Sequence, residues 1–182
     1  VGVSKQFGTL TVLENLNASI KSGSALGVVG PNGAGKTTML NILAGDLAPS
    51  SGSVLFEGID VTNVPSHKRS RKGIGRTSQI PRPFEGLTVY ENILVGATFG
   101  RGKSRKSKSI NQACAFALET TGMTAKANVV AGRLTLLERK RLELARALAI
   151  EPSVLLLDEI AGGLTEMEVH ELIATIKLIR TT

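Results

Sequence analysis

The chain has 182 residues, enough for one hydrophobic core and a smaller satellite, and its 42% apolar and 20% charged residues exclude a disordered protein. It has 22 Lys and Arg against 15 Asp and Glu, and the resulting formal charge of +7 suits nucleotides, nucleic acid or an anionic membrane surface without choosing among them. There is no apolar run of about 18 residues and no signal-peptide pattern, so we expect any membrane role to depend on a partner and no direct membrane insertion.

The first twenty residues show a loose alternation of apolar and polar side chains. Val3, Phe7 and Val12 follow this pattern, and Gly8 lies at the centre of a turn. The pattern predicts two short strands that form an antiparallel edge.

The strongest motif is GPNGAGKTT, at residues 30–38. The apolar residues 25–29 before it predict a buried parallel strand, and the residues after it suit a helix. Gly30, Gly35, Lys36 and Thr37 fall on the G-x-x-x-x-G-K-[ST] spacing, in which backbone N–H groups surround phosphate oxygens. An ordinary glycine-rich turn is the alternative, but four fixed positions match by chance only about once in a hundred chains.

Each part of this loop has a predicted role. Lys36 reaches the β- and γ-phosphates, Thr37 places its hydroxyl on Mg²⁺, and Gly33 and Gly35 let the backbone approach the ligand without a Cβ in the way. The residues expected to surround the nucleotide phosphates are Asn32, Gly33, Ala34, Gly35, Lys36, Thr37 and Thr38.

The segment after this loop alternates turns and short strands. Gly45 is expected to end the helix, and turns are expected at 49–52 and 57–58 on either side of a strand at 53–56. A polar, basic segment at 66–72 precedes a strand at 74–78, which delivers Gln79 to a proline-containing loop.

Helix-capping patterns mark the next part of the chain. Thr88 with Glu91 predicts a helix over 89–97, and Ser109 with Gln112 opens another that runs toward residue 122. The basic stretch 101–108 between them is predicted to be a solvated loop, with a site for a phosphate-rich partner as the alternative. Cys114, the only cysteine, cannot form an internal disulfide and is expected to be packed among apolar neighbours.

Two more capping pairs frame a second candidate site. Thr135 with Glu138 begins a helix that must stop before Pro152, and Thr165 begins the last helix. The apolar run 154–157 between these helices predicts a buried strand that ends in two carboxylates, where open α/β sheets place their ligands.

These carboxylates complete the parts needed for phosphoryl transfer from ATP to water, which requires charge neutralisation, a metal and a positioned water. Asp158 is expected to hold Mg²⁺ beside Thr37, and Glu159 to orient or deprotonate the attacking water. The amide of Gln79 is a further candidate metal ligand. Helix capping or a salt bridge is the alternative reading of the acidic pair.

The phosphate loop, Gln79, the helical insertion, LTLLERKRLELARAL and VLLLDE, in this order, resemble an ABC-type ATPase subunit over nearly the whole chain. VSKQFG, HKRSRKGIGRTSQ and PFEGLTVYENILVGA are most similar to ATP-binding subunits of branched-chain amino-acid importers. The resemblance implies an α/β P-loop NTPase core, with a mostly parallel sheet, flanking helices and an antiparallel N-terminal edge. It further implies a core over 1–87 and 134–182, a helical insertion over 88–133, and a C-terminal truncation.

The resemblance also implies roles for single residues and partners. Phe7 stacks on adenine with Val12 alongside, and Gln79 links the nucleotide site to a transmembrane partner that docks on the helical insertion. Lys36, Gln79 and Glu159 act in catalysis with ATP and Mg²⁺. A second ATP-binding subunit, in a homo- or heterodimer, and permease subunits complete the assembly, on the cytoplasmic face of the cell membrane.

The chain departs from the family pattern at several positions. The family signature LSGGQ, which meets the γ-phosphate of ATP on a second subunit, is here Leu134, Thr135, Leu136, Leu137 and Glu138. Leu137 replaces a glycine, and Glu138 adds a negative charge that Arg139, Lys140 and Arg141 can offset. Ile160 and Thr165 replace the usual Pro and Asp or Asn, and the switch histidine is expected beyond residue 182.

Two alternatives remain open beside a transport ATPase. One is a non-transport ABC ATPase that acts on nucleic acid or ribosomes, suggested by the net charge and the basic segments 68–76 and 101–108. The other is a regulatory nucleotide-binding partner with a degenerate signature. The long heptad run typical of DNA-repair members is missing from the sequence, so we expect a nucleic-acid partner less than a permease.

Overall fold

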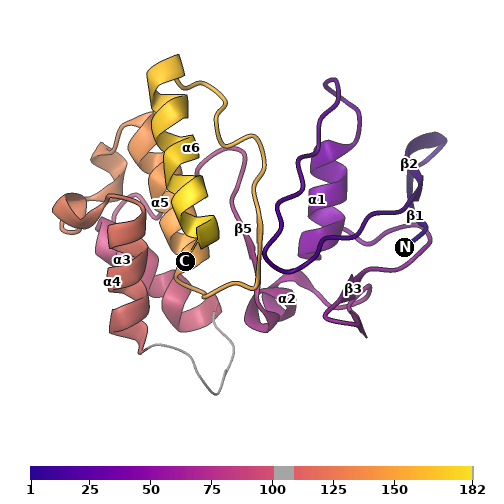
Figure 1. Cartoon of the computed structure of the whole chain (residues 1–182), viewed down its shortest axis with the longest axis horizontal. Helices are drawn as coiled ribbons and strands as arrows, with labels where there is room; N and C mark the ends of the chain where they lie inside the picture. Colours follow the sequence, from indigo (N-terminus) through magenta and orange to yellow (C-terminus); the bar gives the residue numbers. More distant parts are fainter. Residues whose placement is uncertain (101–108, 182) are drawn as a thin grey trace. The chain divides into compact units, whose positions relative to one another are not determined.

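The computed structural model describes residues 1–100 and 109–181. The chain forms two compact units, Val1–Arg69 and Ser70–Thr182, with the boundary inside helix α2 (Ser66–Lys72). Figure 1 shows the helices and strands of both units. The sequence prediction for 101–108 lies outside the described residues.

The first unit builds a small core around a hairpin and a helix. Strands β1 (Val3–Phe7) and β2 (Leu10–Leu16) pair antiparallel, and helix α1 (Lys36–Ala44) ends at Gly45 in the left-handed conformation, both as predicted. Strands β3 (Leu55–Phe56) and β4 (Ile59–Asp60) form a second hairpin, whose turn residues Glu57 and Gly58 have positive φ. The buried core of this unit consists of Val3, Leu13, Ile42, Val54 and Val61.

The prediction of a buried parallel strand at 25–29 is wrong for the described structure. This segment has no strand pairing and its side chains are exposed, with Val29 94% exposed. A parallel strand needs a parallel neighbour, and the paired strands of Val1–Arg69 are two antiparallel hairpins. Apolar composition alone therefore did not determine the conformation here.

The second unit contains the parallel pair. Strands β5 (Ile74–Arg76) and β6 (Val154–Leu156) run side by side, and the N–H of Thr77 extends the ladder to the Leu156 carbonyl at 3.0 Å. Both strands are shorter than predicted. Because they are parallel, the residues that follow each of them emerge at the same edge.

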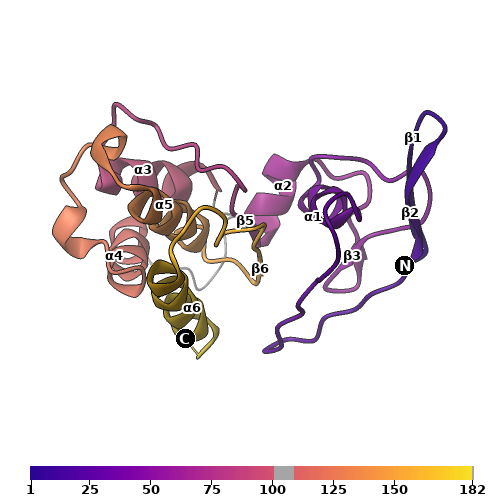
Figure 2. The same cartoon turned by 90° about the horizontal axis from the view of Figure 1, so that it is seen from above.

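Helices make up most of the second unit (Figures 1 and 2). They are α3 (Val89–Val95), extended by a π-helical turn at Gly96–Gly100, α4 (Ile110–Thr120), α5 (Leu136–Leu148) and α6 (Glu166–Thr181), with 3₁₀ turns at Thr124–Lys126 and Ala131–Arg133. Their shared core includes Ile93, Leu142 and the fully buried Cys114, whose packing was predicted. Within 1–100 and 109–181, none of the helices is long and apolar enough to cross a membrane.

The predicted helix starts are confirmed by their hydrogen bonds. The side chains of Thr88, Ser109 and Thr135 accept from the third helical N–H, and the third residue's side chain accepts from the capping N–H in return. Thr165 and Glu168 make the same reciprocal pair. These patterns are local in sequence, so they could be recognised without knowledge of the fold.

Candidate functional site

The phosphate loop precedes the N-terminus of α1. Gly33 and Gly35 adopt φ of 82° and 86°, and Gly35 caps α1 without a side-chain hydrogen bond. A Cβ on Gly35 would lie 2.9 Å from Leu13 Cδ2 and 3.0 Å from the Val12 carbonyl oxygen, so only glycine fits between the loop and β2. Residues 30–34 are exposed, and the uncapped helix end next to them is favourable for an anion.

Lys36 folds back over this loop. Its Nζ donates to the carbonyl oxygens of Gly30 and Pro31, each at 2.8 Å. Thr37 and Thr38 lie half-buried in the first turn of α1. The loop thus combines the ammonium group of a long lysine side chain, two hydroxyl groups and the N-terminus of a helix.

The two residues predicted to contact adenine lie on the neighbouring hairpin. Val12 approaches the loop at Gly35, as its Cγ1 would be 3.2 Å from a Cβ there. Phe7 lies at the end of β1, 49% exposed, with Lys5 Nζ 5.1 Å from its ring centroid. An exposed aromatic ring on the same hairpin as Val12 can offer a stacking face.

The carboxylates lie in the second unit, after β6. Asp158 is 2% exposed, and its Oδ2 lies 3.5 Å from Nη2 of Arg76, at the end of β5. Glu159 has a φ of 42°, a left-handed conformation that costs a non-glycine residue about 1 kcal/mol or more. Such strain is frequent at functional sites.

Gln79 and Glu159 are brought into contact. Gln79 Nε2 donates to Glu159 Oε2 at 2.5 Å, although the two residues are 80 positions apart in the sequence. The parallel pairing of β5 and β6 explains this contact, since both residues follow the carboxyl end of a strand.

Each unit by itself offers hard oxygen donors of the kind that Mg²⁺ prefers. In Ser70–Thr182 these are the Asp158 carboxylate and the Gln79 amide, and in Val1–Arg69 it is the Thr37 hydroxyl. Mg²⁺ is usually held by one or two such side chains together with substrate phosphates.

The signature segment 134–138 is occupied by its own hydrogen bonds. Glu138 Oε2 accepts from the Thr135 N–H at 2.9 Å, and Oε1 lies 3.1 Å from Lys126 Nζ. The Thr135 N–H, followed by Lys126, lowers the pKa of Glu138 against the opposing effect of burial. Lys126, which the sequence did not single out, thus offsets this charge, whereas Arg139 and Arg141 pair with other carboxylates.

The sequence suggested Lys140 only as a counter-charge to Glu138, and its burial was not predicted. It lies on α5 and is only 6% exposed. Burial lowers the pKa of its ammonium group, and the negative charge of Glu159 opposes this shift. In the sequence Lys140 stands between Arg139 and Arg141, and nothing there indicated that it is the buried one of the three.

Comparisons with known proteins identify the family of the chain. A model of the ABC transporter family matches residues 13–162. The chain is 34% identical over 192 residues to the high-affinity branched-chain amino acid transport ATP-binding protein BraF of Pseudomonas aeruginosa, covering 99% of this chain and 75% of that protein. It is also 38% identical over 163 residues to the sulfate/thiosulfate import ATP-binding protein CysA of Mannheimia succiniciproducens, covering 89% of this chain and 45% of that protein.

A solved structure supports the same assignment. The dimeric post-hydrolysis structure of the ATP-binding cassette MJ0796, bound to ADP and Pi, is similar with a TM-score of 0.81 and 27% identity, over 98% of this chain and 81% of that one. The phosphate loop, the carboxylates after β6, the family match over 13–162 and these relatives agree, and the chain belongs to the ABC transporter family of ATPases, with the P-loop NTPase fold expected from its sequence.

Proposed function

We propose that the chain is the ATP-hydrolysing subunit of an importer for branched-chain amino acids, working on the cytoplasmic face of the cell membrane with a permease and a second ATP-binding subunit. The contact between Gln79 and Glu159 at the shared edge of β5 and β6 is the observation that carries the hydrolytic part. The similarity to BraF supports the solute, and the similarity to CysA makes sulfate the competing choice.

In this proposal the phosphate loop binds the triphosphate. Residues 32–38 surround it with backbone N–H groups, and Lys36 exchanges its two carbonyl contacts for the β- and γ-phosphate oxygens. The exchange replaces two neutral acceptors with charged ones, which strengthens the hydrogen bonds. Phe7 and Val12 hold the adenine.

The second unit supplies the hydrolytic groups. Glu159 accepts a proton from the attacking water, whose oxygen forms a bond to the γ-phosphorus while the bond to the ADP oxygen breaks. When bound, Mg²⁺ would neutralise charge on the phosphates, and Thr37, Asp158 and Gln79 are the side chains that would hold it.

Two substitutions test this assignment in the intact natural protein. We expect Lys36→Ala to weaken MgATP binding at least tenfold in calorimetry, because the loop loses its only ammonium group. Glu159→Gln keeps the shape and the bond to Gln79, so we expect unchanged binding and a kcat at least a hundredfold lower. Hydrolysis at the wild-type rate in Glu159→Gln contradicts its role as base.

The solute is tested separately by uptake. Cells that lack the gene should lose uptake of radiolabelled leucine and keep uptake of sulfate, and the wild-type gene should restore it. Loss of sulfate uptake alone argues for the competing solute.

A second candidate function is favoured by the signature segment. The Glu138 carboxylate already binds the N-terminus of α5 and Lys126, which leaves less of this helix end for a phosphate. The chain then binds ATP but depends on a different ATP-binding subunit for turnover. Turnover that is absent for the chain alone and appears when a second ATP-binding subunit is added supports this alternative, whereas turnover by the chain alone argues against it.

A further inference from the structure

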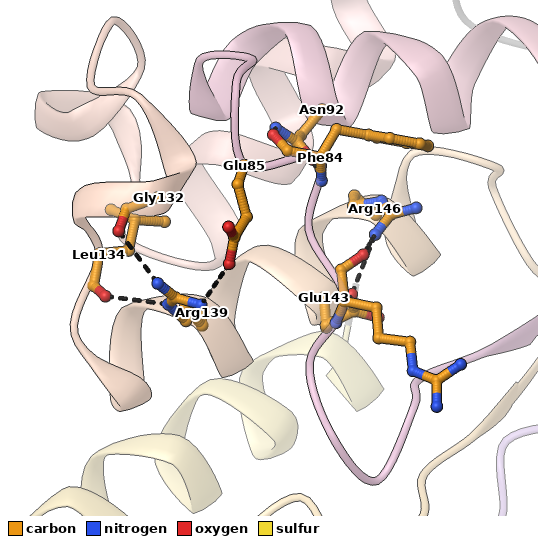
Figure 3. Close-up of polar contacts among 9 residues, drawn as sticks. Phe84, Glu85, Asn92, Gly132, Leu134, Arg139, Glu143 and Arg146 are labelled. Carbon is orange, nitrogen blue, oxygen red and sulfur yellow. Dashed lines mark hydrogen bonds and ion pairs between the residues drawn. The ribbon is translucent and has the colours of Figure 1, made fainter.

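The loop that follows Gln79, residues 80–87, is held against α5 by a charged face of that helix (Figure 3). Arg139, Glu143 and Arg146 are spaced by four and three residues and therefore lie on one side of α5. All three make contacts with the loop. The sequence did not single out Glu143 or Arg146, and it suggested Arg139 only as a counter-charge to Glu138.

Glu143 and Arg146 bind both polar groups of a single residue of the loop. Glu143 Oε1 accepts from the N–H of Arg82 at 3.0 Å, and Arg146 Nη1 donates to the Arg82 carbonyl at 3.0 Å. The two side chains also pair with each other at 2.9 Å, and their side chains are 9% and 23% exposed. The contacts are to main chain, so they fix the path of the loop whatever side chain stands at 82.

The far end of the loop has further attachments. Phe84 lies 5.0 Å from the Arg146 guanidinium, and its main chain is bound on both sides by the buried Asn92 amide. Arg139 pairs with the exposed Glu85 at 3.1 Å and also donates to the carbonyls of Gly132 and Leu134 (Figure 3). The Arg82 contact is thus the attachment nearest to Gln79.

Only two residues, Ile80 and Pro81, separate Gln79 from this attachment, and proline fixes one of the intervening φ angles. A tether of this length gives Gln79 little freedom once Arg82 is held. A largely buried ion pair contributes little to stability compared with apolar side chains of the same size, which favours a conformational role for this one.

We propose that Glu143 and Arg146 are positioning residues for ATP hydrolysis, which hold the main chain at Arg82 so that the Gln79 amide stays within reach of Glu159. This inference rests on the proposed function of Gln79 and Glu159. It assigns to the middle of α5 a role separate from that of the signature segment at its N-terminus.

The test is a double-mutant cycle on kcat in the intact protein. Glu143→Leu removes the acceptor for the Arg82 N–H, and we expect kcat to fall at least tenfold while the KM for ATP stays within twofold, because the phosphate loop is unchanged. In a Gln79→Ala background the same substitution should change kcat less than twofold. Full additivity of the two substitutions overturns the proposal, since a merely structural defect would add to the loss of Gln79.

Two matched variants control this cycle. Glu143→Gln keeps an oxygen that accepts from the Arg82 N–H and should retain kcat within threefold of wild type. Glu85→Ala removes an exposed side chain at the far end of the same loop and should leave kcat unchanged. A loss in Glu85→Ala equal to that in Glu143→Leu contradicts a specific role for the Arg82 contact.

Hydrogen exchange separates failure of this inference from failure of the proposed function. Glu143→Leu should accelerate amide exchange at least tenfold in peptides that cover 80–84, with no change in α1. Unchanged exchange there overturns the inference even if Glu159→Gln abolishes turnover. If Glu143→Leu accelerates exchange but the wild-type protein hydrolyses no ATP, the proposed function is overturned. The catalytic role of the Arg82 contact is then overturned with it.

Discussion

The most demanding prediction concerns Arg69, which is 1% exposed in the first unit. Its guanidinium donates to four carbonyl oxygens: those of Val64 at 2.7 Å, Ile42 at 2.7 Å, Leu43 at 2.9 Å and Thr62 at 2.8 Å. Two of these, Ile42 and Leu43, belong to the last turn of α1, and the Ile42 carbonyl also accepts from the N–H of the cap residue Gly45. Burial lowers the pKa of Arg69, and the charges of Asp46 and Asp60 oppose this.

The cost of removing Arg69 follows from these contacts. A hydrogen bond from a charged group is worth about 1.5–3 kcal/mol, but the desolvation of the guanidinium cancels part of the sum. For Arg69→Met, which keeps the packing of the stem, we expect a loss of about 3–5 kcal/mol, by analogy with breaking a buried ion pair. At about 2–4 °C per kcal/mol for a chain of this size, Tm falls by roughly 6–20 °C.

Thermal unfolding followed by circular dichroism measures this loss. Lys68→Met, one position earlier on α2 and exposed, is the matched control and should shift Tm by less than about 2 °C. Arg69→Lys can donate to only some of the four carbonyl oxygens, so its Tm should lie between those of Arg69→Met and Lys68→Met. A Tm for Arg69→Met within 2 °C of wild type refutes the reasoning.

Three further predictions concern the phosphate loop and α5. Gly35→Ala should lower Tm and weaken MgATP binding clearly more than Gly33→Ala, because both have positive φ but only Gly35 faces β2 at 2.9 Å; equal effects contradict the steric argument. Glu138 has a lowered pKa in the fold, so its contribution of about 1 kcal/mol is present above its unfolded pKa near 4.5 and is lost as pH falls through the lower folded value. Chemical denaturation should therefore show a gap between wild type and Glu138→Gln that narrows from pH 6 to pH 3, and a constant gap is evidence against this. Lys140→Met should raise Tm slightly, because burial disfavours the charged ammonium; a fall of more than about 4 °C shows that attraction to Glu159 outweighs desolvation.

The sequence predicted what is encoded locally. The capping pairs at Thr88, Ser109, Thr135 and Thr165 each place donor and acceptor within three residues, so each helix start could be found without tertiary information. The turns at Gly8 and Gly58 were found for the same reason. The segment 25–29 failed because burial of a strand depends on a neighbour that composition does not specify.

Parts of the candidate site were predictable through topology. The sequence placed Gln79 and Glu159 each after a predicted strand, and because β5 and β6 are parallel the two residues meet at one edge and are in contact. The ion pair of Glu143 and Arg146 could not be predicted, because it binds main chain and leaves no complementary residue at 82. The burial and contacts of Arg69 could not be predicted for the same reason, since its acceptors on α1 are backbone carbonyls 26 and 27 residues away.

Helix α5 makes two separate sets of charged contacts, one at its N-terminus and one in its middle. Its N-terminus is engaged by Glu138 and Lys126, which bears on how a phosphate from outside this chain would be received. Its middle binds the loop after Gln79 through Glu143 and Arg146, which bears on hydrolysis at the chain's own Glu159. These contacts share no residue, and the loop contact does not require the signature glycines. Leu136 and Leu137, at the positions of the family's usual glycines, take no part in the Arg82 contact, so under the proposed function the altered signature leaves the positioning of Gln79 by Glu143 and Arg146 in place.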